Sequence, residues 1–333
     1  MNQGITLPNN VDYIFHIADI HIRNWKRHKE FRQVFDKMFE ELDKCSPNTI
    51  VTVGGDIVHA KTEMSPELIS MVSYLFKRLA DRRPTFVITG NHDANLNNTH
   101  RLDALTPIIQ GLKHRNLWYL RDSGLYDIYT PVHKIGLSVF SLLGETDKYI
   151  TYDKIDNPDQ YDLLMALYHG TVANSKVDSG MNIEHGLSWD TFAGFDVAPL
   201  GDIHKRQVLS TENPLMFYPG STVQQNFGEA YEGHGYGIID VRDLAELHVA
   251  AAENVNASGR YFGVNQSYKW EEILNTFSTV YKSYTPPPRF EGDAKIPTQF
   301  DHSRKNSLGV TLRPLEETLR DLITFMKERN VIE

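Results

Sequence analysis

The chain has 333 residues, of which 41% are hydrophobic, enough for one large core or for one core with an appendage. Its formal net charge is −9, so a nucleic-acid partner would be held by local basic patches or through metals, not by a global positive field. The single cysteine, Cys45, excludes an intramolecular disulfide. With no long apolar run and no leader pattern, we expect a cytoplasmic protein that binds no membrane.

The first predicted strand covers residues 11–17 and ends at Asp19-Ile20-His21. A basic island follows at once, and its candidate DNA contacts are Arg23, Lys26, Arg27 and Lys29. Most charge runs are solvated helix faces, whereas the position of this one after ligand-type residues favours contact with a phosphate backbone. The sequence leaves both interpretations open.

Residues 28–44 have helical apolar spacing, which predicts a packing helix. The next strand, 49–53, runs into Gly54-Gly55-Asp56, with His59 three residues later. Glycines let backbone and ligand approach without a Cβ in the way, so both carboxylate oxygens of Asp56 can be free. Asp56 is therefore our first candidate for a residue that bridges two cations.

Ser65-Pro66 predicts the start of a second helix. A strand at 85–89 then presents Asn91, His92 and Asp93, and a third helix is expected from Arg101 or Leu102. Alternating strands and helices predict parallel strands, whose following loops share one edge of a sheet.

The pattern changes from about 117 to 145, where short strands predict a second, more antiparallel sheet. Residues 146–160 are polar and are expected to form a loop. Strand 163–168 then presents His169, and strand 195–200 presents Asp202 and His204.

Seven side chains form the predicted metal-ligand set: Asp19, His21, Asp56, Asn91, His169, Asp202 and His204. Carboxylate, amide and imidazole ligands suit Mn²⁺, Mg²⁺ or Fe²⁺ better than a thiolate zinc site. Two such ions can clamp a phosphate and activate water, while His92 protonates the leaving oxygen and Asp93 orients its ring. Each residue alone is more often a helix cap or a satisfied polar group, so the prediction depends on their occurring together.

The order of these motifs resembles the calcineurin-like metallophosphoesterase superfamily. Within it, Gly54–His59, Tyr218–Thr222 and Phe227–Glu229 resemble the SbcD-type DNA nuclease subunit, over about residues 11–240. The resemblance implies a four-layer α-β-β-α sandwich of the α/β class. It also implies Mn²⁺-dependent DNA cleavage, exonucleolytic on duplex ends and endonucleolytic on single strands, in DNA repair or recombination.

The resemblance also implies residue roles. One ion would be held by Asp19, His21, Asp56 and His204, and the other by Asp56, Asn91, His169 and residue 202. His92 would be the catalytic histidine, and His59 would orient the phosphate. One position departs from the pattern, because the family usually has histidine where this chain has Asp202. A carboxylate there can still bind a hard cation, but it adds negative charge.

Residues 241–333 resemble the C-terminal part of extended short-chain reductases, so we predict a fusion with domains at 1–240 and 241–333. The chain has neither the glycine-rich dinucleotide turn nor a Tyr-x-x-x-Lys pair, so we expect a catalytically silent tail that does not bind NADP. Amphipathic helices are expected near 242–252, 268–281 and 314–329. Their apolar faces would pack on the phosphoesterase or on a second copy, forming a homodimer, or stay disordered.

The leading hypothesis is therefore a two-metal DNA nuclease. The alternatives are a phosphoesterase acting on nucleotides or phosphoproteins, and a DNA-end-binding protein whose metal site is impaired. An SbcC-type SMC-like ATPase is the partner that the resemblance implies, although the segment that would dock on it is not recognisable in the tail. A reductase activity is disfavoured by the missing motifs.

Overall fold

The computed structural model describes residues 3–177, 181–211, 213–225, 235–240, 270–282 and 314–328. Backbone contacts divide the chain into two compact units, Met1–Ala245 and Glu246–Glu333. Within the described residues, no helix has both the length and the apolar character needed to cross a membrane.

A five-stranded sheet carries the first three groups of candidate ligands. Its strand order is β12 (Gly237–Asp240), β2 (Tyr13–Ile17), β3 (Thr49–Val53), β4 (Thr85–Val87) and β5 (Leu117–Tyr119). The last four strands are parallel, as predicted for β2 to β4, while β12 joins the edge of β2 antiparallel. The loops that follow β2, β3 and β4 therefore share one edge.

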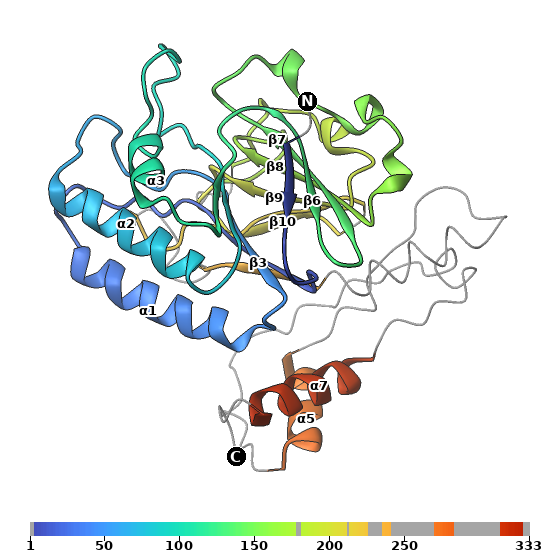
Figure 1. Ribbon diagram of the computed structural model, residues 1–333. Helices are drawn as coiled ribbons and strands as arrows, with labels where there is room; N and C mark the ends of the chain where they lie inside the picture. Colours follow the sequence, from blue (N-terminus) through green and yellow to red (C-terminus); the bar gives the residue numbers. More distant parts are fainter. Residues whose placement is uncertain are drawn as a thin grey trace. The chain divides into compact units, whose positions relative to one another are not determined.

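Three helices cover one face of this sheet: α1 (His28–Lys44), α2 (Pro66–Ala80) and α3 (Thr106–Leu112). Figure 1 shows α1 and α2 side by side. α1 buries Phe31, Phe35 and Phe39 at helical spacing, and the Ser65 hydroxyl caps α2 by accepting a hydrogen bond from the Leu68 amide. Both helices confirm the prediction.

The third helix begins later than predicted. The Asp103 carboxylate accepts hydrogen bonds from the amides of Leu105 and Thr106 at 3.0 and 2.7 Å and from the Thr106 hydroxyl at 2.7 Å. These contacts satisfy the amides at the helix start, so α3 begins at Thr106 and not near residue 101.

A seven-stranded sheet supplies the remaining ligands. Its order is β1 (Gln3–Thr6), β6 (Gly124–Tyr129), β7 (Lys134–Phe140), β8 (Leu163–His169), β9 (Val197–Gly201), β11 (Leu215–Tyr218) and β10 (Gln207–Ser210). Only the β6–β7 and β10–β11 pairs are antiparallel. The predicted antiparallel pairing is confirmed for β6 and β7. The rest of the sheet is largely parallel, because the segment after β7 crosses over and returns the chain parallel in β8, and the predicted strand at 117–120 joins the first sheet as β5.

The two sheets stack face to face. Their shared core includes Ile14, Ile50 and Phe86 from the first sheet and Leu137 and Met165 from the second. The outer face of the second sheet is covered by the short 3₁₀ segments Thr146–Lys148, Tyr152–Lys154, Pro158–Gln160 and Trp189–Phe192. The predicted α/β sandwich is confirmed, with 3₁₀ turns taking the place of α-helices in the fourth layer of the described part.

In the second unit, α5 (Trp270–Val280) packs against α7 (Leu315–Glu328). Both lie where amphipathic helices were predicted. The Lys327 ammonium group is 5.4 Å from the centroid of the Tyr281 ring, which links the two helices at one end. The predicted helix at 242–252 lies outside the described residues.

Candidate metal centre

Four of the seven predicted ligands have left-handed backbone conformations. Their φ angles are 53° at Asp19, 52° at His21, 54° at Asp56 and 102° at Asp202. A side chain in this region costs about 1 to 3 kcal/mol unless its surroundings impose it. The four residues lie in loops after β2, β3 and β9, where such turns bring the side chains back toward the sheet edge.

Backbone hydrogen bonds join the first two loops. The Asp19 amide donates to the Gly55 carbonyl at 3.1 Å, and the amides of Ile20 and His21 both donate to the Asp56 carbonyl at 2.9 Å. The parallel pairing of β2 and β3 thus continues beyond the strands. It fixes Asp19, His21 and Asp56 relative to one another.

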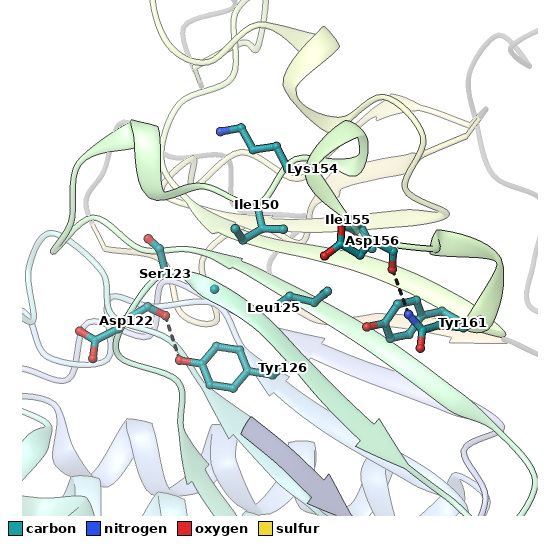
Figure 2. A pocket seen from close by; sticks show the side chains of 11 residues that line it. Asp122, Ser123, Leu125, Tyr126, Ile150, Lys154, Ile155, Asp156 and Tyr161 are labelled. Atoms are coloured by element: carbon teal, nitrogen blue, oxygen red, sulfur yellow. Dashed lines mark hydrogen bonds between the residues drawn. The ribbon is translucent and has the colours of Figure 1, made fainter. Parts of the chain in front are cut away.

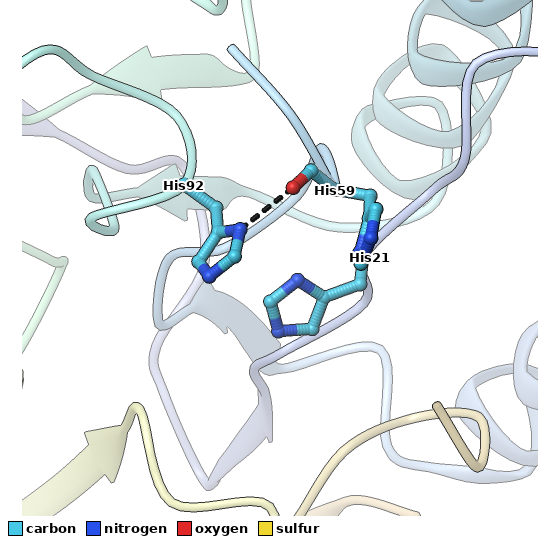
Figure 3. A group of neighbouring side chains, drawn as sticks. All are labelled: His21, His59 and His92. Carbon is cyan, nitrogen blue, oxygen red and sulfur yellow. Dashed lines mark hydrogen bonds between the residues drawn. The ribbon is translucent and has the colours of Figure 1, made fainter. Parts of the chain in front are cut away.

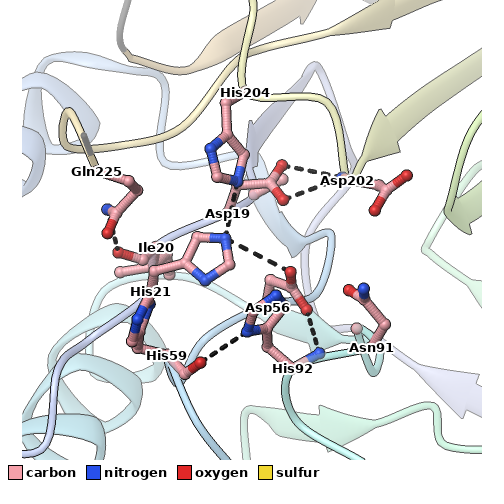
Figure 4. Close-up of polar contacts among 12 residues, drawn as sticks. Asp19, Ile20, His21, Asp56, His59, Asn91, His92, Asp202, His204 and Gln225 are labelled. Carbon is pink, nitrogen blue, oxygen red and sulfur yellow. Dashed lines mark hydrogen bonds and ion pairs between the residues drawn. The ribbon is translucent and has the colours of Figure 1, made fainter. Parts of the chain in front are cut away.

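The two carboxylate oxygens of Asp56 face different groups of ligands (Figure 4). Oδ2 lies 3.4 Å from His21 Nε2, which is 2.9 Å from His204 Nε2. Oδ1 lies 3.4 Å from His169 Nε2, which is 3.1 Å from Asn91 Oδ1. Asp56 is therefore shared between two clusters of nitrogen and oxygen atoms.

Glycines make room for this arrangement. Gly55 has a φ of 92°, and a Cβ there would stand 2.6 Å from His169 Nδ1. A Cβ on Gly90 would overlap the carboxylate of Asp56. His169 Nδ1 donates to the Gly54 carbonyl at 2.7 Å, which turns Nε2 toward Asp56.

The buried charges of the cluster oppose one another. Burial raises the pKa of Asp19, helped by Asp56 and Asp202 and opposed by His169. Burial opposes ionisation of Asp56, but His169, His21 and the hydrogen bond from the His92 amide together lower that pKa. Burial would lower the pKa of His169, but Asp56, Asp19 and Asp202 together raise it. The three carboxylates of Asp19, Asp56 and Asp202 carry more negative charge than the neighbouring histidines can neutralise. Divalent ions bound here would supply the missing positive charge.

The donor set fits divalent metal ions. Burial lowers the pKa of His21 to about 3, so its ring is neutral and has a lone pair for ligation. Its Nε2 faces His204 Nε2 at a distance where one cation can take both nitrogens. Two close groups, Asp19-His21-His204 and Asp19-Asp56-His169, combine oxygen with imidazole and contain no thiol.

Asp202 lies at the edge of this cluster. Its amide donates to both Asp19 oxygens, at 3.0 and 3.1 Å, and its carboxylate accepts from the Thr171 hydroxyl at 2.9 Å. Oδ1 of that carboxylate lies 3.9 Å from His169 Nε2. The Asp202 backbone thus orients Asp19, while ligation by its side chain stays a prediction.

His92 stands next to the bridging carboxylate. Its amide donates to Asp56 Oδ1 at 2.8 Å, and its ring Nδ1 donates to the His59 carbonyl at 2.6 Å. Figure 3 shows its ring beside those of His21 and His59. The ring of His59 is 5.9 Å from that of His92 between centroids. With Nδ1 fixed, Nε2 is left for proton exchange with a substrate.

The structure corrects the role predicted for Asp93. Its Oδ1 accepts from the amides of Ile57 and Val58 at 2.9 and 3.0 Å, and Oδ2 accepts from the Gly90 amide at 2.9 Å. Asp93 is fully buried and ties the two ligand-bearing loops together. The carbonyl of His59, not Asp93, orients the His92 ring.

The basic island divides into two kinds of residue. Arg23 donates to the Gln225 carbonyl at 3.0 Å, and Arg27 donates to the Gln224 carbonyl at 2.7 Å. These two predicted DNA contacts anchor the chain's own backbone. Lys26 and Lys29 are exposed, and their contact with DNA stays a prediction.

Sequence reasoning missed several supporting residues. Lys61 Nζ donates to the Asn91 carbonyl at 2.8 Å, and the Tyr218 hydroxyl donates to the Gly170 carbonyl at 2.8 Å. The sequence marked Tyr218 only as the first residue of the segment Tyr218–Thr222 that resembles the SbcD-type subunit, without indicating this role. Nothing in the sequence pattern marked Thr171 or Lys61, because both act through loops that meet only in three dimensions.

A separate cavity of about 430 Å³ lies between the start of β6 and the 3₁₀ segments of residues 146–160 (Figure 2). Its lining includes Asp122, Lys154 and Asp156 but none of the candidate ligands.

A profile of the calcineurin-like phosphoesterase family matches residues 13–188, more than half of the chain. The chain belongs to the calcineurin-like phosphoesterase family. The match covers the strands and loops that carry all the candidate ligands except Asp202 and His204.

This calcineurin-like phosphoesterase is 45% identical over 233 residues to an uncharacterized protein of Acanthamoeba polyphaga mimivirus, a match covering 68% of the chain and 17% of that protein. It is 25% identical over 260 residues to the D subunit of the SbcCD nuclease of Staphylococcus epidermidis, covering 69% and 66%. It is also 31% identical over 105 residues to the tetraketide alpha-pyrone reductase 1 of Arabidopsis thaliana, covering 31% and 32%. The chain thus spans only a small part of the mimivirus protein and a third of the reductase.

A solved structure titled as a novel archaeal phosphodiesterase covers 68% of this phosphoesterase at 13% identity, with a TM-score of 0.32. This likeness is too distant to bear on function. The family binds two divalent metal ions, and the two clusters on either side of Asp56, one with His21 and one with His169, are where this chain would hold them. When bound, such ions supply Lewis-acid activation of a phosphate and of water.

Proposed function

We propose that the chain is a two-metal nuclease that hydrolyses DNA phosphodiesters, with Mn²⁺ as the preferred ion. The observation that carries the proposal is the division of the Asp56 oxygens between two ligand clusters, 3.4 Å from a histidine on each side. Similarity to a nuclease subunit over 69% of the chain supports nucleic acid as the substrate. Exposed Lys26 and Lys29 beside the site supply local positive charge in an acidic chain.

Each residue has a role that follows from its position. Asp56 lies between the two clusters, with His21 beside one of its oxygens and His169 beside the other. His92, fixed through Nδ1, presents Nε2 to protonate the leaving oxygen. His59 holds that ring through its carbonyl and lies close enough to help orient a phosphate.

The test is cleavage of labelled single-stranded and duplex DNA with Mn²⁺ by the wild type, Asp56→Asn and His92→Asn. We expect wild-type cleavage and at least a 100-fold loss in both variants. Asp36→Asn is a matched control, because that carboxylate is exposed on α1 and accepts a hydrogen bond from the Tyr74 hydroxyl, away from the candidate ligands. Wild-type activity in Asp56→Asn would contradict the proposal.

The same assay separates the alternatives. Hydrolysis of nucleotides or phosphoproteins without cleavage of DNA would favour a phosphoesterase of different specificity. Binding of DNA ends without turnover would favour an end-binding protein whose metal site Asp202 impairs.

The tail and the partners form a separate proposal. We propose that residues 241–333 derive from a short-chain reductase and are catalytically silent, on the basis of the missing dinucleotide turn and the reductase similarity. Calorimetry should give no submicromolar NADP binding. An SbcC-type ATPase and a second copy of this chain stay predicted partners. Co-purification with the ATPase and the solution mass test them.

A further inference from the structure

We propose that Trp25 is a stacking platform for an unpaired nucleobase of a single-stranded substrate. The proposal rests on the proposed nuclease function and names a substrate contact for it. Single exposed hydrophobic residues are common on protein surfaces, so exposure alone would carry no weight. What distinguishes Trp25 is its position in an anchored loop that starts at the candidate ligand His21.

Trp25 is 66% exposed although the loop around it is anchored on both sides. On one side, the Asn24 side chain and carbonyl accept hydrogen bonds from the Ser65 amide and hydroxyl, both at 2.9 Å. On the other, Arg27 donates to the Gln224 carbonyl at 2.7 Å. The backbone on either side of the ring is therefore fixed, and a rigid aromatic ring loses little entropy when a partner stacks on it.

The anchored loop starts in the metal centre. His21 opens it, and its Nε2 is 3.4 Å from Asp56 Oδ2. Arg23, two residues before Trp25, donates to the Gln225 carbonyl at 3.0 Å, and the Gln225 side chain donates at 3.3 Å to the carbonyl of Ile20, between the candidate ligands Asp19 and His21. A strand with one phosphate at Asp56 would therefore pass its neighbouring nucleotides close to Trp25.

The surroundings of the ring match a nucleic-acid strand. Lys26 Nζ is 5.2 Å from the centroid of the Trp25 ring, and Lys29 is exposed on the first turn of α1. Beyond Ser65, Met64 lines a cavity of about 320 Å³ that reaches Lys61 and Leu102, close to the Asn91 loop. Aromatic faces between lysines bind single strands by stacking bases and pairing with phosphates.

The experiment compares two substrates that share a backbone: a fluorescent oligothymidylate and an abasic oligomer of equal length. Binding to the full chain is measured by fluorescence polarisation with chelator, and cleavage is measured with Mn²⁺. We expect Trp25→Ala and Trp25→Leu to raise Kd and KM for oligothymidylate by about 5- to 100-fold. Both should change values for the abasic oligomer less than twofold. Trp25→Phe should restore most of the affinity.

Val132→Ala is the matched control, because Val132 is 65% exposed in the turn between β6 and β7. An equal loss on both oligomers in Trp25→Ala, a leucine as effective as phenylalanine, or no wild-type preference for oligothymidylate would overturn the inference. A wild type that prefers oligothymidylate but cleaves neither oligomer would contradict the nuclease function and leave the stacking contact supported.

Discussion

At the scale of single residues, the site depends on how closely backbone can approach Asp56. Gly90 passes so near that a Cβ would overlap the Asp56 carboxylate and amide. We predict that Gly90→Ala displaces that carboxylate, removes metal binding and lowers the free energy of unfolding by about 1 to 3 kcal/mol. Metal content after dialysis and urea unfolding measure both effects.

Gly111→Ala is the control for that substitution. Gly111 lies in α3, and a Cβ added there would meet nothing within 4 Å, so alanine should stabilise the helix by about 0.5 to 1 kcal/mol. Equal metal content in Gly90→Ala and Gly111→Ala would mean that Asp56 tolerates displacement.

The candidate ligands could be predicted because each follows an apolar strand, whereas supporting roles could not. Asp93 accepts hydrogen bonds from three amides that come from two loops, and no sequence pattern records such a meeting. Arg23 and Arg27 were predicted to contact phosphates. In the structure their guanidinium groups donate hydrogen bonds to carbonyls about 200 residues away in the sequence.

At the scale of elements, His16 joins the two sheets. From β2, its Nδ1 is 2.8 Å from the Thr52 hydroxyl and its Nε2 is 3.1 Å from the Leu200 carbonyl of β9. Burial lowers its pKa to about 4 from an ordinary value of 6.5. The unfolded chain therefore binds a proton between these pH values that the folded chain excludes, so stability falls as the pH drops from 6.5 to 4.

We predict that His16→Gln removes about 3 kcal/mol of this pH dependence, although it is less stable than the wild type at pH 8. Urea unfolding of both proteins in chelator, at several pH values, measures the difference. If the free energy of unfolding changed equally with pH in the two proteins, His16 would not be the source of the pH dependence.

Element types were predictable where apolar periodicity was strong, as in α1, α2 and β2 to β4. The second sheet was not, because its order depends on a crossover whose 3₁₀ segments have no periodic signal. The sheet to which β5 belongs was not predictable either, because nothing in a strand of three apolar residues specifies its neighbour. In the structure β5 pairs with β4 at the edge of the first sheet.

At the scale of the whole molecule, β12 forms one edge of the five-stranded sheet although it comes last in the sequence of that sheet. It pairs with β2 from Gly237 opposite His16 to Asp240 opposite Tyr13. We predict that a fragment of residues 1–245 folds and keeps its Mn²⁺-dependent activity within a few fold. A fragment of residues 1–234 leaves the edge of β2 unpaired, so its Tm should fall by about 5 to 10 °C or it should aggregate.

Thermal unfolding and solution mass measure both fragments. Equal Tm values would mean that β12 adds nothing to the sheet. If the fragment of residues 1–245 folded but were inactive, the second unit would be needed for catalysis. That unit contains the segment that resembles a reductase.

The central claim is that one carboxylate, that of Asp56, holds two divalent ions. Anomalous diffraction at the manganese edge, from crystals grown with Mn²⁺, tests it most directly. We predict two peaks, one within bonding distance of each Asp56 oxygen, and at most one peak in Asp56→Asn. A single peak in the wild type, or two unchanged peaks in Asp56→Asn, would contradict it.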